Sequence, residues 1–138
     1  MPRLTRWMLR ASLLYLLAAL LLRLALVAPE GPWGGEVGLL APIWIHLLVL
    51  GFATQLIFGV AHWMFPRFSS SRPRGFEGLL ELAFVGLNGG LLLRAFAEPL
   101  LGAGAAGPWR SLLVLSAALQ GLALLAFISN LWPRVRGR

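Results

Sequence analysis

Residues 40–66, with the sequence LAPIWIHLLVLGFATQLIFGVAHWMFP, decide the fold because they are long and apolar enough to cross a lipid bilayer. About 20 residues of α-helix are needed to cross a hydrocarbon core of roughly 30 Å. The segment also carries both histidines of the chain, His46 toward one end and His62 toward the other. Any metal or proton chemistry is therefore expected to involve this segment.

The composition excludes an ordinary soluble domain. Hydrophobic residues make up 59% of the 138 residues and charged residues 12%, about half the charged fraction of a typical soluble protein. The chain has no cysteine, which rules out disulfides, thiolate metal sites and cysteine nucleophiles. No glycine-rich phosphate loop and no Ser-His-Asp set is present, so nothing in the sequence indicates hydrolytic, phosphoryl-transfer or nucleic-acid chemistry.

Three further apolar runs flank the central segment. Together the four runs predict an all-α, four-helix transmembrane bundle that forms a single domain over residues 1–138. A cleaved signal peptide is the alternative for the first run, although Arg23 interrupts it and Pro29 follows it directly. Small residues would let the helix backbones approach closely: Gly51, Gly59, Gly86, Gly89 and Gly90. The predicted helices cover residues 9–28, 40–65, 76–97 and 109–132.

The basic residues and the tryptophans predict the topology. All twelve basic residues are arginine, and nine of them fall on one side of a four-span arrangement, as the positive-inside rule requires. Three of the six tryptophans fall at each membrane boundary, which is typical of aromatic belts. We therefore expect both termini in the cytoplasm. Arginine in place of lysine and the lack of aspartate are typical of a GC-rich genome, and we expect a prokaryotic inner (plasma) membrane.

Polar side chains inside the spans are candidates for function, because a bilayer makes unpaired polar groups costly. Gln55, Asn88 and Gln120 fall near the middle, each on a different helix. We expect them to form interhelical hydrogen bonds worth roughly 0.6–2 kcal/mol each. Residues predicted to face the bundle interior are Gly51, Gln55, Gly59 and His62 on the second helix, Glu81 and Asn88 on the third, and Ser116, Gln120, Phe127 and Asn130 on the fourth.

His46 falls outside this predicted interior. At 100° per residue it lies about 160° around the helix from His62, with roughly 24 Å of rise between them. Arg94 also falls on the outward side of its helix, at a similar depth. A histidine and an arginine are unusual in lipid contact, and they indicate a second buried surface, formed with a cofactor, a partner chain or both.

Each candidate polar residue has a functional and a structural interpretation. His46 could be an axial ligand of a haem iron, with Arg23, Arg94 and Arg110 as partners of the haem propionates. Alternatively, His46 bonds a backbone carbonyl or a lipid headgroup, and the arginines extend to the membrane surface. His62 could form a second metal site, or a proton relay with Glu81 or Glu77. Alternatively, it forms a structural His-Glu pair near the headgroups.

The second segment carries a family resemblance. The runs His46-Leu-Leu-Val-Leu-Gly51 and Gly59-Val-Ala-His62-Trp-Met-Phe-Pro66-Arg67 resemble the second transmembrane helix of the catalytic subunits of haem-copper oxidases and bacterial nitric oxide reductases. The resemblance implies that His46 matches the histidine that binds the low-spin haem in that family. It implies no role for His62. The other haem and copper ligands of the family lie on later helices, so no catalysis is expected from this chain alone.

We therefore expect a haem-b-binding membrane protein of the respiratory or denitrification system. It would be an electron carrier or a haem-containing accessory subunit of a nitric oxide reductase or terminal oxidase. Coordination by two histidines would require a second chain, most simply His46 of a second copy in a dimer. The alternatives are a cofactor-free accessory or assembly subunit of such a complex, or a small transporter or metal-handling protein that uses Gln55, Asn88 and Gln120, with His62 and Glu81 as a proton path.

Overall fold

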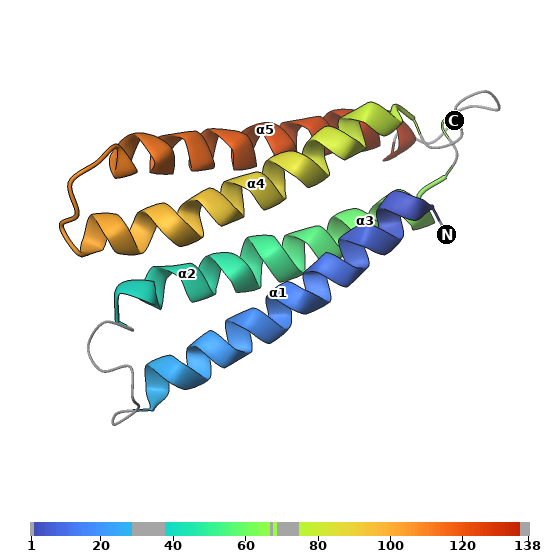
Figure 1. Ribbon diagram of the computed structural model, residues 1–138. Coiled ribbons are helices and arrows are strands. Elements are labelled where there is room, and N and C mark those ends of the chain that lie inside the picture. Colours follow the sequence, from blue (N-terminus) through green and yellow to red (C-terminus); the bar gives the residue numbers. More distant parts are fainter. Residues whose placement is uncertain (1, 29–37, 67, 69–74, 136–138) are drawn as a thin grey trace.

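The computed structural model describes residues 2–28, 38–66, 68 and 75–135, and every element within them is a helix (Figure 1). Most residues between the first and second predicted helices, and most between the second and third, lie outside the described residues. The predicted all-α fold is confirmed. Four helical stretches in the described part of the chain are long and apolar enough to cross a membrane, which makes the chain a multi-pass membrane protein.

The first stretch is α1 (Arg3–Val27). The second, residues 38–64, begins with a short 3₁₀ turn and continues as α2 (Ala41–His46), the π-helix η2 (Leu47–Thr54) and α3 (Gln55–Met64). The third and fourth stretches are α4 (Glu77–Gly102) and α5 (Trp109–Val135).

Three predicted helix ends are wrong, two of them at prolines. The first helix does not begin at residue 9 but at Arg3. The third helix does not end at residue 97 but continues through Pro99 to Gly102. The fourth does not end before Pro133 but continues to Val135. Proline removes one backbone donor, yet its own carbonyl still accepts, and Ala103 N donates to Pro99 O at 2.8 Å. The third and fourth helices therefore extend about one turn beyond the apolar runs that predicted them.

The bundle consists of two helical hairpins, α1 with the α2–η2–α3 span and α4 with α5 (Figure 1). Glycines on α4 allow the two helices of the second hairpin to pack closely. A Cβ atom added at Gly90 would lie 2.9 Å from Ser116 O, and one at Gly86 would lie 3.1 Å from Leu119 O. This Gly-x-x-x-Gly spacing brings two backbones together, and Ser116 Oγ uses the short separation to donate to Gly90 O at 2.7 Å.

Glycines of the second span also allow it to pack closely against α1 in the first hairpin. A Cβ atom at Gly51 would lie 2.6 Å from the Tyr15 ring, and one at Gly59 would lie 3.2 Å from Met8 Cβ. The predicted close approach is thus confirmed at four of the five glycines. It is wrong for Gly89, which has no atom within 4 Å of its added Cβ.

Aromatic stacking and a hydrogen bond join the two hairpins. The rings of Phe58 and Phe127 stack with centroids 3.7 Å apart and an interplanar angle of 5°. Nearer the middle, Tyr15 Oη donates to Asn88 Oδ1 at 2.8 Å. The main cluster of buried apolar residues surrounds the stacked rings and lies toward the end that carries the N-terminus. It comprises Met8, Phe58, Leu80, Ala83, Ala126 and Phe127.

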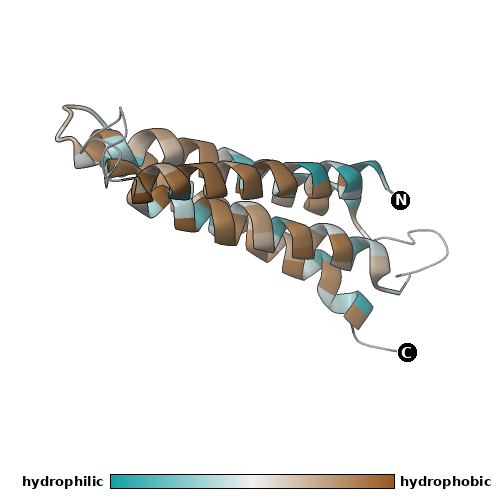
Figure 2. Cartoon of the chain, turned by 90° about the horizontal axis from the view of Figure 1, so that it is seen from below, coloured by the Kyte–Doolittle hydropathy of each residue, from teal (hydrophilic) through white to brown (hydrophobic). Residues whose placement is uncertain are grey.

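The outer surface of the bundle is apolar. Hydrophobic residues cover most of each helix, and hydrophilic residues gather at the N-terminal end of α1 (Figure 2). Leu14, Leu24 and Phe96 are each more than two-thirds exposed. Exposed apolar side chains along whole helices are what contact with lipid requires.

The glycine contact between α4 and α5 gives a paired prediction. We expect Gly90→Ala to lower the melting temperature in detergent, because its Cβ would meet the Ser116 carbonyl and overpacking costs about 1–3 kcal/mol. Gly89→Ala is the matched control. It lies in open space on the same helix and should keep or raise the melting temperature, since alanine favours helix over glycine by about 0.5–1 kcal/mol. Equal melting temperatures for the two variants would contradict the packing argument.

Candidate functional site

His46 lies at the junction of α2 and η2, near the end of the bundle away from the N-terminus, and is half-buried. Its Nδ1 is 2.9 Å from Pro42 O, one helical turn earlier. A carbonyl oxygen only accepts hydrogen bonds, so Nδ1 carries the hydrogen and the lone pair of the neutral ring lies on Nε2. The backbone carbonyl contact is the one that the structural interpretation of His46 predicts. The same contact is also the usual orienting bond of metal-ligating histidines.

A π-helix begins directly after His46. In η2 each amide bonds five residues back rather than four, so each turn holds more residues than an α-turn. The predicted angle between His46 and His62 assumed 100° per residue throughout, and that assumption is wrong across residues 47–54. The predicted inner face is confirmed, because Gly51, Gln55, Gly59 and His62 are all buried. Wide turns of this kind occur frequently at functional sites.

The three arginines proposed as propionate partners differ in their surroundings. Arg23 is exposed, and its guanidinium carbon lies 5.1 Å from the ring centroid of Trp44, within the range of a cation–π interaction. Arg94 Nη1 is 3.3 Å from Glu98 Oε1 in an ion pair along α4. Arg110 is exposed at the start of α5. Within the described residues, no hydrogen bond or ion pair joins any of the three arginines to His46.

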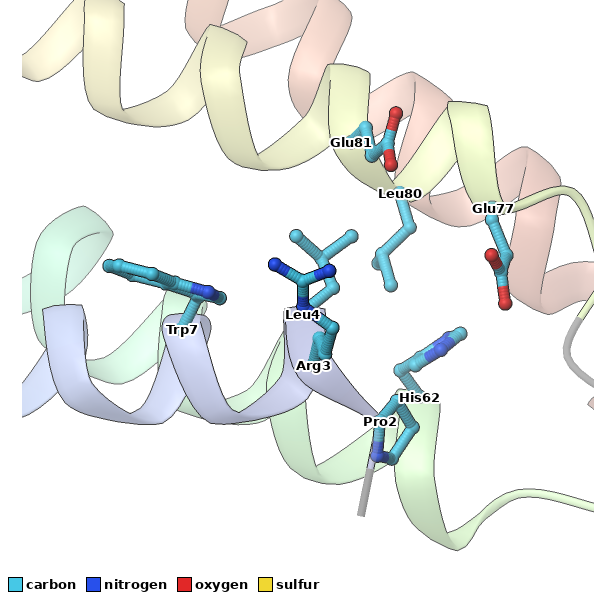
Figure 3. Close-up of a pocket in the computed structure, with 8 residues that line it drawn as sticks. All are labelled: Pro2, Arg3, Leu4, Trp7, His62, Glu77, Leu80 and Glu81. Atoms are coloured by element: carbon cyan, nitrogen blue, oxygen red, sulfur yellow. The ribbon is translucent and has the colours of Figure 1, made fainter.

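His62 lines a different site, at the opposite end of the same span. A cavity of about 460 Å³ lies between the first turns of α1 and α4 and the last turns of α3. His62 is 2% exposed. Glu77 and Glu81 lie in the wall of the same cavity, as their predicted depth requires, but Glu81 is exposed rather than interior. The described residues contain no group of three histidine, aspartate or glutamate side chains spaced to hold a metal ion. The residues lining the cavity are shown in Figure 3: Pro2, Arg3, Leu4, Trp7, His62, Glu77, Leu80 and Glu81.

The three central amides behave differently from one another. Asn88 joins two helices as predicted, because it accepts from Tyr15 and donates to Phe84 O within its own helix. Gln120 acts indirectly, through a 3.2 Å bond from Nε2 to Ser116 Oγ. Gln55 contradicts the prediction. It is 0% exposed, and neither side-chain atom has a hydrogen-bond partner among the described residues.

Arg134 is a structural residue that the sequence interpretation missed. It is one of the nine arginines that were predicted to lie together on one side of the membrane, but it is only 5% exposed. Its Nε donates to Pro66 O at 2.9 Å, and its Nη2 donates to Phe65 O at 2.7 Å and to His62 O at 3.0 Å. The last carbonyls of a helix have no partner within that helix. Because α3 ends at Met64 and no capping glycine follows before Pro66, the need for an external hydrogen-bond donor at this helix end was the available signal.

Asn130 plays the matching part at the start of α4. Its Oδ1 accepts from Phe76 N at 2.8 Å and lies in close contact with Gly75, whose φ of 77° suits glycine. The C-terminal end of α5 therefore holds both the end of α3 and the start of α4.

Comparison with protein families, with curated proteins and with solved structures finds no match to this chain.

The contrast between Gln55 and Gln120 is testable by substitution with methionine, which is similarly long and unbranched. We expect Gln55→Met to raise the melting temperature in detergent, because a buried polar group without a partner costs about 1–3 kcal/mol. Gln120→Met should lower it slightly, since a membrane hydrogen bond contributes about 0.6 kcal/mol on average. A loss of stability in Gln55→Met as large as that in Gln120→Met would show that Gln55 has a partner.

The Arg134 contacts predict a large loss of stability on their removal. We expect Arg134→Met to lower the free energy of unfolding by at least about 1.5–3 kcal/mol, the contribution of one hydrogen bond to a charged group. Arg10→Met is the control, because Arg10 is exposed on α1. Denaturant titration in detergent measures both variants, and a loss no greater than in the control would refute the capping role.

Proposed function

We propose that this chain is a haem-b-binding protein of a prokaryotic inner (plasma) membrane, with both termini cytoplasmic. It serves the respiratory or denitrification system as an electron carrier or as a haem-containing accessory subunit of a nitric oxide reductase or terminal oxidase. The observation that supports this proposal is the bond between His46 Nδ1 and Pro42 O. This bond fixes the imidazole and leaves Nε2 as the atom that can ligate iron.

The three arginines at the His46 end of the bundle differ in how readily they could pair with haem propionates. Arg23 packs on Trp44, two residues before His46, so a cation lies at the same end of the span as the proposed iron ligand and can pair with a propionate. The charge of Arg94 is shared with Glu98, although Arg94 Nε is buried without a partner among the described residues and can still donate. Arg110 is exposed near the same end of the bundle. A bound haem would supply one-electron redox chemistry at its iron.

A second copy of the chain completes the proposed site. His46 is half-buried, and its neighbour Ile45 and the nearby Val49 are each 49% exposed, so the ring lies beside an apolar surface that a twofold-related copy can cover. A closed twofold dimer would bring two copies of His46 to one iron. This arrangement gives one haem for every two chains.

A cofactor-free accessory or assembly subunit is the second candidate function. An apolar depression of about 270 Å³ runs along the outer side of α4 and α5. It could receive side chains from a helix of a larger complex, which would pack there without any cofactor. The residues that line it include Leu82, Gly86, Leu122 and Leu125.

The haem proposal is tested by visible spectroscopy of protein purified from a haem-supplied host. We expect Soret and α-band absorbance at one haem per two chains, and its loss in His46→Ala. His62→Gln is the control and should keep the absorbance, because His62 lies at the other end of the span. A preparation that stays colourless after haemin is added would refute haem binding and leave the accessory-subunit function.

A further inference from the structure

The cavity beside His62 is separate from the proposed haem site, since the two lie at opposite ends of the second span. Its wall combines charges of both signs. Arg3 comes from α1, whereas Glu77 and Glu81 come from consecutive turns of α4. In Figure 3 the Arg3 guanidinium extends from α1 toward α4, and the Glu77 carboxylate extends from α4 toward the end of α3 where His62 lies. The cavity therefore presents one cation and two anions to a single space.

These charges do not neutralise one another. In the described part of the chain the one ion pair is between Arg94 and Glu98, near the far end of α4. Arg3, Glu77 and Glu81 share the cavity without pairing among themselves. Their hydrogen-bonding groups are therefore available to a ligand that carries both a negative and a positive group.

The helix faces that carry these charges become apolar toward the middle of the bundle. On α1, Arg3 and Trp7 are one turn apart, and Leu14 lies two turns beyond Trp7 on the same side of the helix. On α4, Val85 lies one turn beyond Glu81. Leu14 is 68% exposed and Val85 is 65% exposed. A polar cavity at the membrane boundary thus continues into exposed apolar ridges on both helices.

We infer that this cavity binds a phospholipid headgroup that combines a phosphate with a primary ammonium, the chemistry of phosphatidylethanolamine. Arg3 donates to the phosphate oxygens, and Glu77 and Glu81 accept from the ammonium. The acyl chains lie along the ridges that contain Leu14 and Val85. Trp7 lies between the two regions, at the depth where amphipathic rings favour the membrane interface.

The α3 wall of the cavity is held in place by the hydrogen bonds of Arg134. The imidazole of His62 lines the cavity, while the backbone carbonyl of the same residue accepts from Arg134 Nη2 at 3.0 Å. The shape of the cavity therefore depends on the contact between α3 and α5, and not only on α1 and α4.

Headgroup chemistry provides the discriminating experiment. Phosphatidylcholine has a trimethylated ammonium without N–H donors, and phosphatidylglycerol has no cation. We expect native mass spectrometry of the delipidated protein, titrated with each lipid in detergent, to show about tenfold tighter binding of phosphatidylethanolamine than of either lipid, which is the equivalent of one charge-assisted hydrogen bond. Equal binding of phosphatidylcholine, or tighter binding of phosphatidylglycerol, would overturn the proposal.

Variants locate the binding within the molecule. Arg3→Gln and Glu81→Gln should each weaken binding of phosphatidylethanolamine about tenfold. Arg6→Gln, an exposed arginine of α1 outside the cavity wall, should leave it unchanged. Unaltered binding in both cavity variants would refute this location. The comparison among lipids uses the unsubstituted chain, so it holds even if a variant folds poorly.

Soluble phosphoethanolamine tests whether the cavity binds a membrane lipid or a free small molecule with the same headgroup. It should fail to displace the lipid at concentrations at which the lipid itself competes, because it lacks the acyl chains. Displacement at equal concentration would exclude the lipid. None of these measurements depends on haem, so their failure would leave the haem proposal untouched.

Discussion

The hydrocarbon interior of a bilayer offers no hydrogen-bond partners, and most features of this structure follow from that constraint. Helices satisfy their backbone groups internally except at their ends. Where α3 ends, Arg134 supplies the missing donors, and where α4 begins, Asn130 supplies an acceptor. Inside the bundle, Ser116 places its hydroxyl on a neighbouring carbonyl. Arg134 and Asn130 are thus buried where they complete the backbone of another element.

The ring stacking and most side-chain hydrogen bonds between the two hairpins are concentrated toward one end, while toward the other end α2 and η2 pack against α4. The stacked rings of Phe58 and Phe127 and the bonds of Arg134 all lie near the termini of the chain. Toward the other end, His46 is half-buried, and the neighbouring Ile45 and Val49 are each 49% exposed. One end of the bundle is thus held by specific bonds, while the proposed haem site lies where the bundle remains accessible to a second chain.

Hydropathy and length were sufficient to predict the four spans, and helical periodicity was sufficient to predict the buried face of α3. The prediction was wrong at Pro99 and Pro133, because apolar runs indicate where the hydrocarbon ends and not where the helix ends. Gly89 and Gly90 are adjacent and chemically identical, and only the packing angle of α5 decides which of them faces its backbone. Arg134 was assigned to the membrane surface because charge patterning gives the side of the membrane but not the direction of a side chain.

Polar side chains inside the spans were the hardest to assign. Gln55 and Asn88 are similar by composition and depth, yet one has no hydrogen-bond partner among the described residues and the other joins two helices. The difference arises from the position of a single tyrosine on α1. Positions of this kind depend on how the helices pack, which a single sequence does not contain.

The π-helix η2 interrupts the α-helical periodicity of the second span between α2 and α3. In a continuous α-helix, a rotation of about 100° per residue would fix the direction of His46 relative to the glycines that pack against α1. The wide turns of η2 change this angle, because each turn holds more residues than an α-turn. The number of residues within η2, rather than the identity of any side chain, therefore sets the direction in which the imidazole faces.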